Sequence, residues 1–320
     1  MNSNACIPVF FAVDDAYAPY LSVALNSIVA HISPDRSYRA IVLYTTLKEE
    51  NKKRIASAAR DRFAIDFVPM QGGLESIQDR MSNRLRCDYF TLTIYFRLFI
   101  PLMFPQYDKG IYIDSDVILN ADLAELFDTD IGDNLIGACN DRSIMEIPEL
   151  VDYVENAVGV PKQTYINSGV LLMNLKKLRQ VSLEERFLTL LNQYHFNSVA
   201  PDQDYINAMC HGHIFYLDEG WDAMPNENHP ELAAPKLIHY NLFSKPWCYD
   251  GVQYADYFWN FAKVSPYYED IVRFKKEYDD TKKEEDSNCL KLLIERASEI
   301  VSDEITFKKM HETGVEIRLC

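Results

Sequence analysis

Asp114 and Asp116 are the two residues whose type and spacing most directly indicate chemistry. They follow the apolar run Gly110-Ile111-Tyr112-Ile113, which is typical of a buried β-strand, and Ser115 stands between them. Aspartate is depleted in strands, so a pair of them in such a run does not serve the fold well. At a strand end, carboxylates at positions i and i+2 can bind one hard divalent cation, which leaves positions for water and a ligand's phosphate oxygens. The alternative is an Asp-rich turn between two strands.

Strands that alternate with helices are expected to position this pair. Residues 8–13 and 39–44 have the apolar character of buried strands, and residues 17–31 between them carry apolar side chains at helical spacing. This alternation predicts a parallel sheet built from βαβ units, in which ligands bind at the carboxyl ends of strands. Asp14 lies at one such end, and Asp114 lies at another.

Three further segments carry polar residues in apolar surroundings. Arg97 lies within a predicted buried helix over 88–104, where its charge requires either a neighbouring carboxylate or a ligand phosphate. Residues 167–169, Asn-Ser-Gly, begin a predicted strand over 165–174, and they indicate either close approach of a ligand or a β-bulge. Asp202 opens the next predicted helix, where it is a candidate either for the site or for an N-cap.

The rest of the chain predicts one catalytic unit with an appendage. Residues 142–163 are expected to form an insertion over the site. From about residue 265 the chain is rich in Lys, Glu and Asp and has one amphipathic patch, which indicates helices that pack on the core or on a partner chain. We therefore expect a catalytic domain over 1–264 and a helical extension over 265–320, through which a homo-oligomer would form.

Composition excludes several classes of function. The chain has 320 residues, is 48% hydrophobic, and carries a net charge of −16, which disfavours nucleic acid as a partner. No apolar run reaches the roughly 18 residues of a membrane span. The seven cysteines are odd in number and never form a Cys-x-x-Cys pair, which argues against disulfides and zinc-thiolate sites. We expect a cytoplasmic protein, either free or peripheral at the inner face of the membrane.

Six segments in chain order resemble the family 8 glycosyltransferases, the retaining, metal-dependent group that includes bacterial lipopolysaccharide galactosyl- and glucosyltransferases and glycogenin. The likeness covers about residues 7–250, and Tyr112 to Asp116 is similar to the family's DxD motif. It implies a GT-A fold, an α/β architecture in which helices flank a Rossmann-like mixed sheet. The C-terminal helical appendage follows that fold. The six segments are 9–28, 93–98, 112–116, 166–172, 201–204 and 239–247.

The resemblance also implies a UDP-sugar donor held through Mn²⁺ or Mg²⁺. The implied metal ligands are Asp114, Asp116 and His239. Residues implied to contact the nucleotide and its sugar are Ala12, Val13, Asp14, Tyr17, Arg97, Asp114, Ser115, Asn167, Ser168 and Lys245. The implied catalytic residues are Gln203 nearest the anomeric carbon, Asp202 near sugar hydroxyls, and Arg97. The chain departs from the family pattern at Ala16, where Asn is common, and at Leu242 or Phe243, where Gly is common.

The implied activity is transfer of a hexose, glucose or galactose, from a UDP-sugar to a glycan or a lipid-linked or other glycoconjugate in bacterial cell-surface glycan biosynthesis. Gln203 is an amide and a poor nucleophile, which favours same-face attack over double displacement. Two other classes stay open: a non-catalytic nucleotide-sugar-binding protein, and a phosphohydrolase with an Asp-x-Asp nucleophile motif. The phosphohydrolase pattern expects Thr or Val where this chain has Ile118.

Overall fold

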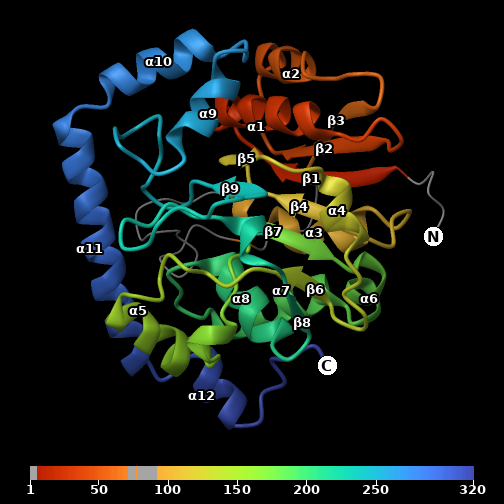
Figure 1. Ribbon diagram of the computed structural model, residues 1–320. Coiled ribbons are helices and arrows are strands. Elements are labelled where there is room, and N and C mark those ends of the chain that lie inside the picture. The colour runs from red at the N-terminus through yellow and green to blue at the C-terminus, as the bar shows by residue number, and fades with distance from the viewer. Residues whose placement is uncertain (1–5, 71–76, 78–91) are drawn as a thin grey trace.

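A seven-stranded mixed sheet forms the centre of the molecule (Figure 1). The computed structural model describes residues 6–70, 77 and 92–320. The strand order in the large sheet is β3-β2-β1-β4-β7-β6-β8, and β5 and β9 form a separate pair. The strands are β1 (Ile7–Ala12), β2 (Tyr38–Tyr44), β3 (Phe63–Pro69), β4 (Gly110–Ile113), β5 (Val117–Leu119), β6 (Ile136–Ala138), β7 (Val170–Met173), β8 (Ile214–Tyr216) and β9 (Leu237–His239).

The direction of the strands changes at β7. Strands β3, β2, β1 and β4 are parallel, as the βαβ pattern predicts, whereas β7 runs antiparallel to both β4 and β6. The parallel sheet that the βαβ pattern predicts is therefore one part of a larger sheet, and the mixed sheet of the GT-A fold is confirmed. The pair Asp114 and Asp116 lies in the connection from β4 to β5, where the chain leaves the large sheet.

Helices cover both faces of the sheet, which explains why its central strands β1, β4, β7 and β6 are apolar along their whole length. Along β1, Phe10 packs in one apolar cluster and Val9 and Phe11 in another, because successive side chains of a strand point to opposite faces. One face carries α1 (Ala18–His31), α2 (Glu49–Ala56), α9 (Ala255–Ala262) and α10 (Tyr268–Glu277). The other carries α3 (Phe96–Met103), α6 (Leu175–Gln180), α7 (Leu183–Tyr194) and α8 (Pro201–Cys210). Helix α4 (Leu123–Asp128) follows β5.

Several predicted elements are shorter in the structure. The helix expected over 88–104 begins with a 3₁₀ turn, η3 (Leu92–Tyr95), before α3, and residues 88–91 lie outside the described residues. The strand expected over 165–174 is β7 over 170–173 alone, with an isolated bridge from Ile166 to Asn140 before it, because residues 168–169 form a turn. Two further 3₁₀ turns among the described residues are η5 (Lys162–Thr164) and η6 (Glu219–Asp222).

The insertion and the C-terminal tail pack on one another. The insertion forms α5 (Pro148–Tyr153) and a π turn, η4 (Val154–Val158), while the tail forms α11 (Asp280–Ser302) and α12 (Phe307–Glu312). Helix α11 runs along one side of the molecule and contacts α5, and α12 contacts η4 (Figure 1). Leu293 and Ala297 of α11 are buried in the same cluster as α3 and α7. No helix among the described residues is both long enough and apolar enough to cross a bilayer.

Candidate active site

A cavity of about 390 Å³ lies at the carboxyl ends of β1 and β4. Since those two strands are parallel neighbours, their ends bring residues 12–17 and 114–116 to the same edge of the sheet. Every site residue expected from the sequence lines this cavity, although the segments are far apart in the chain. These residues are Ala12, Val13, Asp14, Tyr17, Arg97, Asp114, Ser115, Asp116, Asn167, Ser168, Asp202, Gln203, His239 and Lys245.

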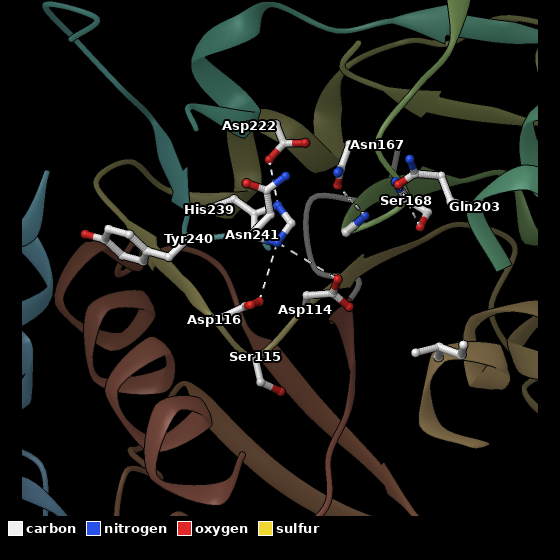
Figure 2. A network of polar contacts seen from close by, with 12 residues as sticks. Asp114, Ser115, Asp116, Asn167, Ser168, Gln203, Asp222, His239, Tyr240 and Asn241 are labelled. Carbon is white, nitrogen blue, oxygen red and sulfur yellow. Dashed lines mark hydrogen bonds and ion pairs between the residues drawn. The ribbon is translucent and has the colours of Figure 1, made fainter. Parts of the chain in front are cut away.

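Asp114, Asp116 and His239 form a cluster that fits a divalent cation. Each offers one ligand atom, and these atoms lie within 4.8 Å of one another. His239 Nε2 is 3.4 Å from Asp116 Oδ1 and 4.0 Å from Asp114 Oδ2 (Figure 2). Two carboxylate oxygens with one imidazole nitrogen are a donor set that suits Mn²⁺. The structure thus brings the three implied ligands together, and their role as ligands stays a prediction.

Gly169 makes room for this cluster. A β-carbon at this position would lie 2.3 Å from His239 Cε1 and 2.8 Å from Asp114 Oδ2, both shorter than real contacts. The backbone N–H of Asp114 also donates to the carbonyl of Gly169 at 2.8 Å. Gly169 therefore permits close approach of the protein's own groups, and close approach of a ligand at residues 167–169 stays a prediction.

Asp222 holds the far side of the His239 ring. Its Oδ1 lies 3.0 Å from His239 Nδ1, and Figure 2 shows the imidazole between Asp222 on one side and Asp114 and Asp116 on the other. Burial lowers the pKa of His239, but the charges of Asp222 and Asp116 more than offset this and raise it to about 10. A cation on Nε2 requires a neutral ring whose remaining proton is on Nδ1, and Asp222 is placed to accept that proton's hydrogen bond.

Lys245 binds the other oxygen of Asp116. Its Nζ donates to Asp116 Oδ2 at 2.6 Å and to the carbonyl of Tyr240 at 2.6 Å. Burial raises the pKa of Asp116, but Lys245 and His239 outweigh burial and hold it below the ordinary value. Asp116 is therefore a carboxylate with one oxygen toward the lysine and one toward the histidine.

Arg97 joins the two acidic parts of the cavity. It is 4% exposed, and its Nη2 donates to Asp114 Oδ1 at 2.9 Å while its Nε lies 3.2 Å from Asp202 Oδ2. Its Nη1 donates to Ser168 Oγ at 3.0 Å. Of the two anions that the sequence left open for Arg97, the structure supplies carboxylates. Arg97 also lines the cavity, so contact with a donor sugar stays a prediction.

Asp202 and Gln203 lie in the first turn of α8 with both side chains held. The N-cap of α8 is Ala200, and Asp202 Oδ2 instead accepts from Ser168 Oγ at 3.0 Å, so the N-cap explanation is wrong. Gln203 Oε1 accepts from the Ser168 N–H at 3.0 Å (Figure 2). Burial raises the pKa of Asp202 to about 6, against the opposing charge of Arg97.

Two buried acids of the site were missed by reasoning from the sequence. Asp141 Oδ2 accepts from Gln203 Nε2 at 2.8 Å and from Asn167 Nδ2 at 3.1 Å, so it fixes both amides. Asp141 follows the carboxyl end of β6, so the rule that identified Asp114 applies to it as well. Asp222, in a single 3₁₀ turn, has no comparable signal in the sequence.

The nucleotide-side residues lie at the end of β1. Asp14 Oδ1 accepts from the Tyr17 N–H at 3.0 Å, and Ser115 Oγ donates to the carbonyl of Ala12 at 3.1 Å. The ring of Tyr20 contacts Tyr17 edge-on and stacks on Trp247 with centroids 4.0 Å apart. These contacts fix the segment that the resemblance assigns to uracil and ribose.

Comparison with known proteins places the chain in a glycosyltransferase family. The family model described as Glycosyl transferase family 8 matches residues 8–251. A Haemophilus influenzae protein is 28% identical over 220 residues, covering 68% of this chain and 64% of its own length. The lipopolysaccharide 1,2-glucosyltransferase of Escherichia coli is 24% identical over 315 residues, covering 87% and 86%. The structure of the galactosyltransferase LgtC with donor and acceptor sugar analogues has a TM-score of 0.68 at 28% identity, covering 81% of this chain and 96% of its own.

Proposed function

Because the chain belongs to glycosyl transferase family 8, we propose that it transfers a hexose, either glucose or galactose, from a UDP-sugar to a hydroxyl group of a glycan or glycoconjugate, with retention and with Mn²⁺ or Mg²⁺. The observation that carries the proposal is one cavity that contains both the Asp114, Asp116 and His239 cluster and the fixed pair Asp202 and Gln203. The glucosyl- and galactosyltransferase relatives support these two sugars. Membership of this family sets the phosphohydrolase alternative aside.

The cluster and Lys245 would act on the leaving group. A divalent cation held by Asp114, Asp116 and His239 would supply positive charge to the diphosphate as the glycosidic bond breaks. Lys245, already beside Asp116, is placed to add a second positive charge near the same oxygens. Without such counter-charge a protein with net charge −16 would repel the donor.

The fixed pair Asp202 and Gln203 supports same-face attack. Double displacement needs a carboxylate nucleophile that is free to reach the anomeric carbon. The Asp202 carboxylate is instead paired with Arg97 and Ser168, and burial weakens its ionisation. Gln203 is an amide whose oxygen and nitrogen are both held, so it can orient the sugar without attacking it. The departing phosphate oxygen would then accept the proton of the acceptor hydroxyl.

Release of UDP from a panel of UDP-sugars, with Mn²⁺ and with EDTA, tests the proposal. We expect UDP-glucose or UDP-galactose to be cleaved in Mn²⁺, and both activity and UDP binding to be lost in EDTA. UDP binding that survives EDTA unchanged, or cleavage of none of the sugars with any acceptor supplied, would contradict it.

A further inference from the structure

One side of the cavity is aliphatic, in contrast to the acids around His239. Ile144 and Ile147 precede α5, Leu150 and Val154 lie in α5 and η4, and Leu290 and Leu293 lie in α11. We call these six residues the aliphatic wall. Ile144, Ile147 and Leu290 are half-buried, so part of their apolar surface stays available to a ligand in the cavity.

The aliphatic wall is a built part of the fold. Tyr153 and Tyr165 donate hydrogen bonds to Asp204 at 2.6 and 2.7 Å, which connects α5 and the segment before β7 to α8. Asp286 of α11 accepts from Tyr249 and Tyr278, each at 2.7 Å, which fixes the other helix of the wall. A surface held from both sides in this way is preorganised for binding.

The wall begins next to the reacting groups. Ile144 follows three residues after Asp141, whose Oδ2 accepts from Gln203 Nε2 at 2.8 Å. Gln203 and the aliphatic wall line the same cavity, so an acceptor whose hydroxyl reaches a sugar held at Gln203 can place its remaining atoms against the wall. The side of the cavity with Tyr17 and Lys245 is assigned to the nucleotide and its diphosphate, so the acceptor is expected on the side of the aliphatic wall.

Charge narrows the class of acceptor. The described lining of the cavity contains one Arg and one Lys, Arg97 and Lys245. Both form ion pairs with acids on the donor side. Asp141 also lines the cavity, Glu146 lies between Ile144 and Ile147 in the chain, and the chain as a whole carries −16. A phosphate-linked acceptor would thus meet acids, and a bare oligosaccharide would leave its hydroxyl groups unpaired against aliphatic side chains.

We infer that the aliphatic wall binds an aliphatic group of a neutral acceptor glycoside, so that α11 of the C-terminal tail forms part of the acceptor site. This inference rests on the proposed function, because it places the acceptor beside the donor site. Since each methylene that leaves water adds several-fold to affinity, a chain of eight carbons should be distinguished sharply from one carbon.

The test is transfer from the cleaved UDP-sugar to methyl, butyl, hexyl and octyl β-glucoside and β-galactoside, below micelle-forming concentrations, with lactose as the bare disaccharide. We expect KM to fall with chain length, by about 10- to 100-fold from methyl to octyl, which corresponds to about two or three of the added methylenes leaving water. A KM independent of chain length, or lactose as the better acceptor, would overturn the inference. If the UDP-sugar is still cleaved in that case, the proposed function stands. Absence of both UDP binding and cleavage would overturn the two together.

A variant pair locates the site. Leu290→Gln should remove most of the dependence on chain length and leave the affinity for UDP in Mn²⁺ unchanged. Leu292→Gln is the matched control, because it makes the same change in the same helix at a side chain that is 52% exposed and outside the cavity lining. Equal loss in both variants, or in neither, would overturn the assignment to α11. Thermal unfolding of each variant checks that it is folded, and the wild-type series does not depend on either one.

Discussion

Replacing Gly169 by alanine tests the geometry of the cation cluster with a single methyl group. The added carbon would lie 2.3 Å from His239 Cε1 and 2.8 Å from Asp114 Oδ2, whereas ordinary contacts begin near 3.4 Å. The imidazole must therefore move by roughly 1 Å, and a ligand atom must keep its metal distance within about 0.2 Å. His239 is fully buried against Asp222 and cannot swing outward without breaking that contact.

We expect Gly169→Ala to weaken Mn²⁺ binding at least about 100-fold. Changing a residue that only hydrogen-bonds a metal ligand weakens metal binding by about 10- to 100-fold, and displacing the ligand itself should weaken it no less. Electron paramagnetic resonance of free Mn²⁺ measures the affinity, with and without UDP. Gly212→Ala is the control: its φ of +88° makes alanine strained, but no atom lies within 4 Å, so stability should fall without loss of the metal. A folded Gly169→Ala protein that binds Mn²⁺ within about threefold of wild type would refute the cluster as the metal site.

Four further changes test the remaining parts of the site. Asp116→Ala should abolish Mn²⁺-dependent UDP binding, measured by calorimetry, because it removes a proposed metal ligand and the partner of Lys245. Asp222→Asn should weaken Mn²⁺ binding about 10- to 100-fold in the same resonance assay, because it supports His239. Gln203→Ala should lower kcat about 10- to 1000-fold with UDP affinity retained; an unchanged kcat would remove it from the mechanism. Burial raises the pKa of Asp202 to about 6, so the folded state favours its protonated form. As the pH falls from about 7 to about 5 in EDTA, the free energy of unfolding of the wild type should therefore rise by about 1 kcal/mol relative to that of Asp202→Asn. Urea unfolding of both proteins at the two pH values measures this difference, and an unchanged difference would contradict the prediction.

The parts of the fold that follow from local pattern were predictable. Buried strands and the amphipathic α1 have clear periodicity, and parallel pairing of β1 with β4 then places Asp14 and Asp114 at one edge. The antiparallel direction of β7 was not predictable from periodicity, because a short buried strand such as Val170–Met173 has the same apolar pattern whether it runs parallel or antiparallel to its neighbours. Its direction came only from the family resemblance.

The candidate site divides in the same way. Asp114 and Asp116 stand out because carboxylates are unusual beside a buried strand, whereas Asp222 is distinguished only by its contact with His239, seventeen positions along the chain. Arg97 shows why a residue type alone was insufficient: a buried guanidinium requires an anion, but only packing decides that Asp114 and Asp202 provide it.

The aliphatic wall depends on contacts between an insertion and a tail that are far apart in the chain, and this explains both why the sequence did not reveal it and why it can set specificity. Leu150 and Leu293 come from segments that each have an ordinary amphipathic pattern, and neither pattern says that the two faces meet beside Gln203. The donor side is built from strand ends and their turns, which the sheet fixes. The acceptor side is built from an insertion and a tail that pack on that frame, so changes in α5 or α11 can alter the acceptor without disturbing the cation cluster.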